Sequence, residues 1–170
     1  MERPRILIAC IGNIFLGDDG FGCAVARELQ RRVLPENARV VDYGIRSLDL
    51  VYGLLDGGDA TIFVDAVPRG AAPGTVYVIE PDAGDLENGE AALDGHTMNP
   101  LHVLRTARAM GAELKNLTLV GCEPETLGGD EGSMELSEPV RAAVATAAGL
   151  VESLVEKISA RSEERATVTK

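Results

Sequence analysis

The sequence lacks tryptophan, and aromatic residues make up only 4% of its 170 residues. The hydrophobic content of 45% therefore comes mainly from Val, Leu, Ile and Ala, a composition typical of helices packed on a parallel sheet. No internal repeat is present. Because the length suits one domain with its own core, we expect a single domain over residues 1–158.

Basic residues are also scarce, since 16 Lys and Arg face 27 Asp and Glu and give a formal net charge of −11. Such an acidic chain disfavours binding to nucleic acid or to an anionic membrane surface, whereas a basic segment of a partner protein would suit it. No apolar run approaches membrane-spanning length, and no signal-type segment is recognisable. We expect a cytoplasmic monomer without nucleic-acid or membrane partners.

Cysteine is equally limited. Cys10, Cys23 and Cys122 are odd in number and lack the C-x-x-C spacing, which argues against both a disulfide framework and a zinc ribbon. Cys10 and Cys23 are most simply core residues. The dinucleotide fingerprint G-x-G-x-x-G and the phosphate-binding G-x-x-x-x-G-K-[ST] are both absent.

Five apolar or β-branched segments predict strands: Arg5–Cys10, Ala38–Asp42, Thr61–Val67, Gly74–Glu80 and Asn116–Cys122. Helical spacing predicts helices over Phe21–Val33, Ser47–Leu55, Asn99–Met110 and Ser137–Ile158. Only the third and fourth strands lack a helix between them, and their link, Pro68–Pro73, is too short for a parallel crossover. The sequence therefore predicts a three-layer α/β/α fold with a five-stranded, mostly parallel twisted sheet and one antiparallel edge strand.

Three segments fall outside this scheme. Pro81–Asn99 and Glu123–Glu135 have no clear periodicity, and long loops in compact domains are often functional. The polar segment Ser159–Lys170 predicts a disordered tail.

Two adjacent acids, Asp18 and Asp19, lie where the first strand gives way to a helix, in the run IGNIFLGDDGFG from Ile11 to Gly22. Ligands of open parallel sheets bind just beyond the carboxyl ends of the strands. Either acid can instead cap the helix that follows, since carboxylates stabilise helix N-termini. The pattern alone leaves both roles open.

A third acid, Asp65, is the polar residue near the carboxyl end of the apolar strand TIFVDAV, where a carboxylate is costly unless paired or bound to a cation. His96 lies in a loop before a predicted helix, whereas His102 lies inside that helix and is more typical of packing or surface histidines. If the loop folds over the sheet edge, Asp19, Asp65 and His96 form a set with open positions that suits a divalent transition metal.

With these residues in view, the chain resembles the hydrogenase maturation endopeptidases. The resemblance rests on GNIFLGDDGFG, DYGIRSLDL, IFVDAV, GHTMNP and LVGCEPE with LSEPV, and it extends from about Arg5 to Ile158. The first of these signatures is long and specific, and IFVDAV and the histidine follow it in the expected order. The resemblance implies a protease that trims the C-terminus of the nickel-iron hydrogenase large-subunit precursor.

The resemblance further implies that Asp19, Asp65 and His96 bind nickel, and leaves helix capping to Asp18. The nickel would belong to the precursor and be bound transiently, so no tightly held cofactor is expected. Two positions differ from the family pattern: Cys10 stands where glycine is common, and Asp19 where some members have Glu.

Several mechanistic alternatives stay open from the sequence. Water could be activated by a metal or by Asp19 or Asp65 as general base. Cys122 has no obvious histidine partner except His96, so a thiol nucleophile is disfavoured. Asp42 and Glu123 could shape the cleft, meet a basic substrate residue, or be turn acids. Rival functions are a metallohydrolase with resident zinc and a non-catalytic, metal-dependent chaperone of the same subunit.

Overall fold

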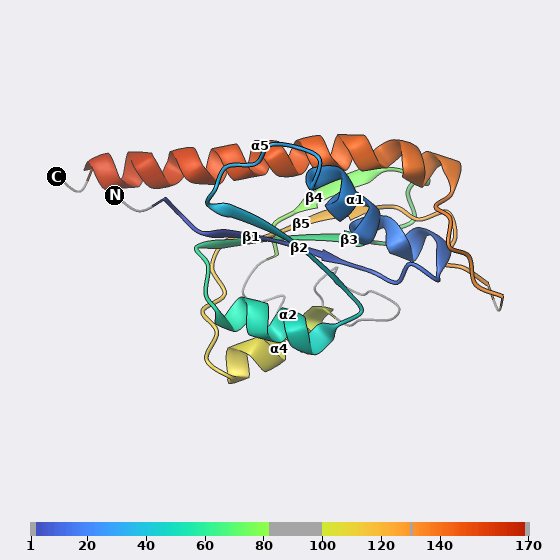
Figure 1. Ribbon diagram of the computed structural model, residues 1–170, viewed down its shortest axis with the longest axis horizontal. Helices are drawn as coiled ribbons and strands as arrows, with labels where there is room; N and C mark the ends of the chain where they lie inside the picture. The colour runs from blue at the N-terminus through green and yellow to red at the C-terminus, as the bar shows by residue number, and fades with distance from the viewer. Residues whose placement is uncertain (1–2, 82–99, 130, 169–170) are drawn as a thin grey trace.

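The computed structural model describes residues 3–81, 100–129 and 131–168. Five strands form one sheet in the order β2-β1-β3-β5-β4 (Figure 1). Their bounds are Ile6–Ile11 for β1, Ala38–Gly44 for β2, Ala60–Ala66 for β3, Val76–Ile79 for β4 and Leu117–Cys122 for β5. All neighbours are parallel except β4 and β5, so the predicted mixed sheet with an antiparallel edge strand is confirmed.

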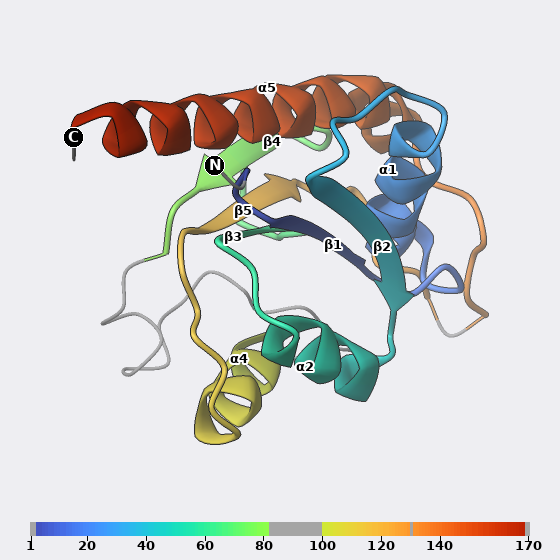
Figure 2. The same cartoon turned by 60° about the vertical axis from the view of Figure 1, so that its left-hand side comes forward.

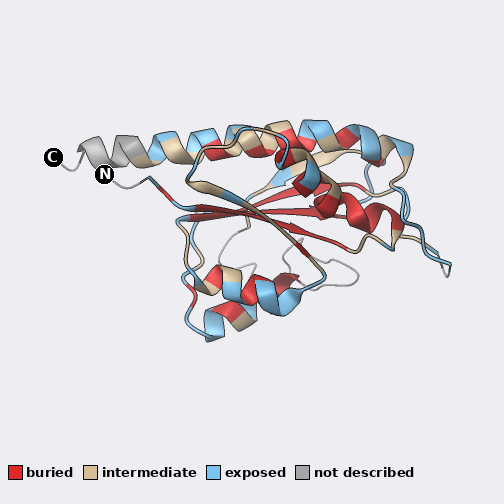
Figure 3. Ribbon diagram, viewed as in Figure 1, coloured by how far each residue is buried: buried red, intermediate tan, exposed pale blue. Residues whose placement is uncertain are grey.

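Helices cover both faces of the sheet. Helices α1 (Phe21–Leu29) and α5 (Glu138–Val168) lie on one face, and α2 (Ser47–Leu55) and α4 (Pro100–Ala109) lie on the other (Figures 1 and 2). Side chains of β1 alternate between the two resulting cores, because successive residues of a strand point to opposite faces. The strands in the middle of the sheet are buried along their length (Figure 3).

Helix α1 passes very close to the sheet at Gly22. A Cβ atom at this position would lie 2.1 Å from the carbonyl oxygen of Ile11 and 2.5 Å from that of Val64. Only glycine avoids these collisions, so the glycine fixes how closely the helix that follows Asp19 lies against β1 and β3.

The ends of three helices differ from the sequence prediction. Helix α1 was predicted to reach Val33 but ends at Leu29, and Val33 is 98% exposed. Met110 was predicted to close the next long helix, but it lies beyond the end of α4 and is 52% exposed. Helix α5 continues to Val168, whereas a disordered tail was predicted from Ser159. No Gly or Pro interrupts residues 159–168, and the Ala, Arg and Glu of this segment favour helix, so polarity alone was a misleading signal. Within the part of the chain that the structure describes, no helix is long and apolar enough to cross a membrane.

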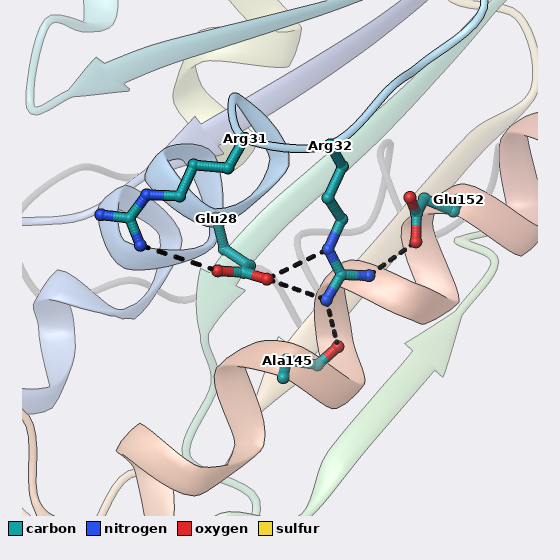
Figure 4. A network of polar contacts seen from close by, with 5 residues as sticks. All are labelled: Glu28, Arg31, Arg32, Ala145 and Glu152. Atoms are coloured by element: carbon teal, nitrogen blue, oxygen red, sulfur yellow. Dashed lines mark hydrogen bonds and ion pairs between the residues drawn. The ribbon is translucent and has the colours of Figure 1, made fainter.

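An ion-pair network joins α1 to α5 (Figure 4). The guanidinium of Arg32 lies 2.6 Å from a carboxylate oxygen of Glu152 and 2.9 Å from one of Glu28, and it also donates to the carbonyl of Ala145. Arg31 reaches Glu28 only at 4.0 Å, and its side chain is 79% exposed. Arg32 thus connects two helices that are far apart in sequence.

We predict that Arg32→Ala lowers the thermal unfolding midpoint more than Arg31→Ala, because only Arg32 has hydrogen-bonded carboxylates from both helices. The difference should shrink at high salt, since partly exposed ion pairs are screened. Melting curves of both variants at low and high salt test this. Equal midpoints for the two variants would contradict it.

Candidate active site

Asp19 and Asp65 lie at the carboxyl edge of the sheet and are both buried, at 2% and 4% exposure. Asp65 is the next-to-last residue of β3, and one of its oxygens accepts a hydrogen bond from the amide of Ala66 at 2.8 Å. Asp19 belongs to the short 3-10 helix η1 (Gly17–Gly20), and its Oδ2 accepts a hydrogen bond from the amide of Asn13 at 2.9 Å. Two buried carboxylates therefore face one part of the sheet edge.

Gly12 allows the backbone of Asp19 to pass close to the end of β1. Gly12 has a φ of +144°, and a Cβ atom there would lie 1.9 Å from the carbonyl oxygen of Asp19. The chain after β1 can therefore fold back tightly enough to bring η1 over the strand ends. This gives a structural reason for the glycine that opens the GNIFLGDDGFG run.

The two acids interact electrostatically. Burial raises the pKa of Asp65 well above its usual value, and the negative charge of Asp19 raises it further, while the hydrogen bond from Ala66 opposes the rise. Two buried carboxylates that repel each other are stabilised by a shared proton or by a cation. The pair can therefore bind a cation or hold and release a proton.

The structure describes one of the two histidines. His96 lies outside the described residues. His102 is exposed on α4, as expected for a surface histidine. Among residues 3–81, 100–129 and 131–168, no group of three His, Cys, Asp or Glu side chains is arranged to hold a metal ion.

Asp18 has a different role from its neighbour. It is completely buried, and its carboxylate accepts four hydrogen bonds: from the amides of Glu125 (2.8 Å) and Thr126 (3.0 Å) and from the amide (2.7 Å) and hydroxyl (2.9 Å) of Ser137. It does not cap α1, whose N-terminus has no side-chain cap. It sits instead at the start of α5, where a carboxylate is favourable.

Backbone hydrogen bonds extend this attachment. We call residues 125–129 and 131–137 the tethered loop. The amide of Asp18 donates to the carbonyl of Thr126 at 3.0 Å, and the amide of Gly17 donates to Ser133 at 2.7 Å. Asp18 and Ser137 are 119 positions apart, so no local sequence pattern could reveal the contact.

Glu123 holds the turn after β3. Its carboxylate accepts hydrogen bonds from the amides of Arg69 (2.8 Å) and Gly70 (3.1 Å) and from the hydroxyl of Tyr77 (2.6 Å). Burial would raise the pKa of Glu123, but these hydrogen bonds outweigh it and lower the pKa. Its contacts are those of a turn-stabilising acid.

Asp42 lies at the end of β2, next to Cys10 in the sheet register. One of its oxygens accepts a hydrogen bond from the amide of Gly44 at 3.0 Å. Burial raises the pKa of Cys23 to about 12, and hydrogen bonding and charge from Asp42 contribute to this rise. The Asp42 carboxylate therefore faces the side of the sheet that α1 covers, where Cys10 and Cys23 are buried.

None of the cysteines is prepared to act as a nucleophile. All three are free and buried, as expected for core residues. Burial raises the pKa of Cys122 to about 12 and that of Cys10 still higher. A thiol with such a pKa carries almost no thiolate at neutral pH, and the thiolate is the reactive form.

A surface cavity of about 310 Å³ lies apart from the acidic pair, between β2 and α2. Its lining includes Arg39, Tyr43, Arg46, Asp49 and Tyr52. Neither Asp19 nor Asp65 lines it, so it is not the centre of the candidate site.

Comparison with known proteins gives consistent results. A family model described as hydrogenase maturation protease matches residues 23–154. The hydrogenase expression/formation protein HupD of Rhizobium leguminosarum bv. viciae is 34% identical over 165 residues, which cover 94% of this chain and 80% of HupD. HoxM of Azotobacter vinelandii, with the same description, is 36% identical over 143 residues, or 84% of this chain and 68% of HoxM.

Solved structures of the same kind share the fold. The hydrogenase maturating endopeptidase HybD from E. coli superposes with a TM-score of 0.76 at 29% identity, covering 90% of this chain and 93% of HybD. The hydrogenase 2 maturation peptidase from Thaumarchaeota archaeon SCGC_AB-539-E09 gives a TM-score of 0.65 at 32% identity. The match covers 86% of this chain and 95% of the archaeal peptidase.

We predict that Asp18→Asn destabilises the protein by about 1–3 kcal/mol. The carboxylate has two acceptor oxygens for its four hydrogen-bond donors, whereas an amide has only one acceptor oxygen. Chemical denaturation measures the loss, and limited proteolysis should show earlier cleavage within the tethered loop. Asp49→Asn is the matched control, since Asp49 is half-exposed and only paired with Arg46 at 3.4 Å. Unchanged stability of Asp18→Asn would contradict the tether.

We also predict that Asp65→Asn is more stable than the parent protein at pH 7. Because the pKa of Asp65 is raised on folding, ionisation above its usual pKa of about 4 costs stability that the neutral amide does not lose. The advantage should shrink as the pH falls towards 4. Unfolding midpoints from pH 4 to pH 8 test this, and a variant less stable than the parent at pH 7 would refute it.

Proposed function

The chain belongs to the hydrogenase maturation protease family, and from this premise we propose its substrate and the roles of its buried acids. It is a hydrogenase maturation endopeptidase, a peptidase among the hydrolases. We propose that its substrate is the precursor of a nickel-iron hydrogenase large subunit, from which it removes a C-terminal extension. We place this reaction in the cytoplasm, with the enzyme acting as a monomer.

The further proposal is that the enzyme recognises nickel that the precursor already holds. The observation that supports it is the pair of buried, mutually repelling carboxylates of Asp19 and Asp65. A divalent cation brought by the substrate would relieve this repulsion, whereas a precursor without metal would not. His96 is the proposed third ligand, and carboxylate and imidazole groups both suit divalent transition metals.

In this proposal the nickel is part of the substrate, not a resident cofactor. Two carboxylates and one imidazole leave coordination positions that the precursor would fill. The purified enzyme should therefore hold no stoichiometric metal. A resident zinc ion would instead favour the rival metallohydrolase function.

Peptide hydrolysis needs an activated water, and two routes fit the proposed site. The metal held by the precursor can lower the pKa of a bound water, or a carboxylate can act as general base. Asp65 is the candidate for the second route, because burial and the charge of Asp19 raise its pKa and make its carboxylate a stronger base. The high pKa of Cys122 argues against a thiol nucleophile.

We predict that Asp19→Asn abolishes processing of a nickel-loaded precursor and leaves the fold intact. The amide oxygen can still accept the hydrogen bond from Asn13, so the local structure is kept while the negative charge is lost. Asp65→Asn and His96→Ala should have the same effect on processing. The test is to incubate each variant with the precursor and weigh the product by mass spectrometry.

His102→Ala is the control, because this histidine is exposed on α4. The His102→Ala variant should process the precursor at the parental rate. Nickel-free precursor should remain uncut by all forms. Full processing by Asp19→Asn would reject the role of its charge, and binding of the precursor without any shortening would favour the chaperone alternative.

A further inference from the structure

Two large apolar side chains are exposed beside the candidate active site. Phe15 is 59% exposed and Met134 is 70% exposed. Phe15 precedes the two acids Asp18 and Asp19, and Met134 belongs to the tethered loop. Aromatic residues and methionine that are exposed together on a surface are typical of protein interfaces.

Backbone contacts bring together the two segments that carry these side chains. The amide of Ser133 donates to the carbonyl oxygen of Phe15 at 3.0 Å, and Leu16 and Ser133 form a parallel bridge. Met134 follows directly in the chain. We call Phe15 and Met134 the apolar tip. Because the two segments are hydrogen-bonded to each other through their backbones, both side chains are presented on an ordered backbone.

The tip is anchored close to the buried acids. The amide of Gly17 donates to Ser133, and Asp18 binds both ends of the tethered loop. The carboxylate of Asp19, one residue farther, belongs to the candidate site. A protein that binds the tip would therefore be positioned against the edge where Asp19 and Asp65 lie.

Acidic side chains predominate around the tip, although the guanidinium of Arg141 donates a hydrogen bond to the carbonyl of Leu136, two residues after Met134. Residues 11–26 and 117–140 contain no Lys or Arg. Glu131 and Glu135 flank Met134 on the exposed part of the tethered loop, and Glu125 and Glu138 are exposed nearer its ends. A complementary surface has an apolar recess bordered by Lys and Arg.

We infer that the apolar tip docks the folded body of the precursor, through a recess with basic borders, while the C-terminal extension reaches Asp19 and Asp65. This rests on the proposed function. The tip is exposed to solvent and the acids are buried, so the two parts of the substrate have separate contact regions. A second copy of this chain is a poorer occupant, because it would bring its own charge of −11 against the same acids.

The test compares the double variant Phe15→Ser/Met134→Gln with Met110→Gln, a matched control in which another exposed methionine, at the end of α4, is changed. With nickel-loaded precursor, the double variant should raise KM at least about tenfold and change kcat less than about twofold, because interface anchors contribute binding energy without touching the scissile bond. Met110→Gln should match the parent in both. Melting curves check that all three forms are folded.

A second variant tests the charge. Glu131→Gln/Glu135→Gln should raise KM at low salt and weaken the salt dependence of kcat/KM, because rim charges act mainly on association. An unchanged salt dependence would overturn the acidic part of the inference.

The outcomes separate this inference from the proposed function. If the parent enzyme does not shorten the precursor, the proposed function fails. If the parent cuts and the double variant keeps its KM, only the docking inference fails. If sedimentation shows a dimer of the parent that the double variant loses while its KM is unchanged, the tip is a self-association surface and the inference is overturned.

Discussion

The carboxylate of Asp18 is the interaction on which the rest of the site depends. It is fully buried, and an ionised carboxylate in that position is tolerated only when its lone pairs are satisfied. Four donors from Glu125, Thr126 and Ser137 satisfy it, and they come from the two ends of the tethered loop. Because Ser137 directly precedes α5, this one group fixes the loop, the start of the last helix and η1 in a single arrangement. The position of Asp19 follows from it, since no rotation of η1 can move one acid without breaking the contacts of the other.

Two adjacent residues of identical chemistry thus have opposite electrostatic situations. The carboxylate of Asp18 is surrounded by donors, whereas that of Asp19 raises the pKa of the nearby Asp65. Asp19 and Asp65 are two buried carboxylates that repel each other, and such a like-charged pair is a cost that functional sites retain and structural sites avoid. The close backbone contacts at Gly12 and Gly22 hold η1 and α1 against the ends of β1 and β3, and this packing keeps Asp19 near Asp65 despite their repulsion.

The sheet could be predicted from the sequence because its signals are local. Apolar runs marked the strands, and the short link Pro68–Pro73 required β4 to be antiparallel. The placement of Asp65 at a strand end followed from the same pattern, and so did the nearness of η1 to that edge. The contacts of Asp18 could not be predicted, since they join residues 119 positions apart. Helix ends were misjudged where propensity and periodicity disagree: Val33 continues the apolar period of α1 but lies beyond it, and the polar residues after Ser159 are good helix formers.

The arrangement also suggests why recognition would be divided between two regions. In the proposed function, the buried acids would distinguish a loaded substrate from an empty one, but they provide little contact area for a folded protein. An exposed, ordered surface provides that area without distinguishing loaded from empty substrate. The tethered loop connects the two regions, because the hydrogen bonds that join the backbone of Ser133 to Phe15 and Gly17 belong to the same network that anchors Asp18. Selectivity for the metal and affinity for the protein can then be set by different residues, and a change in one need not disturb the other.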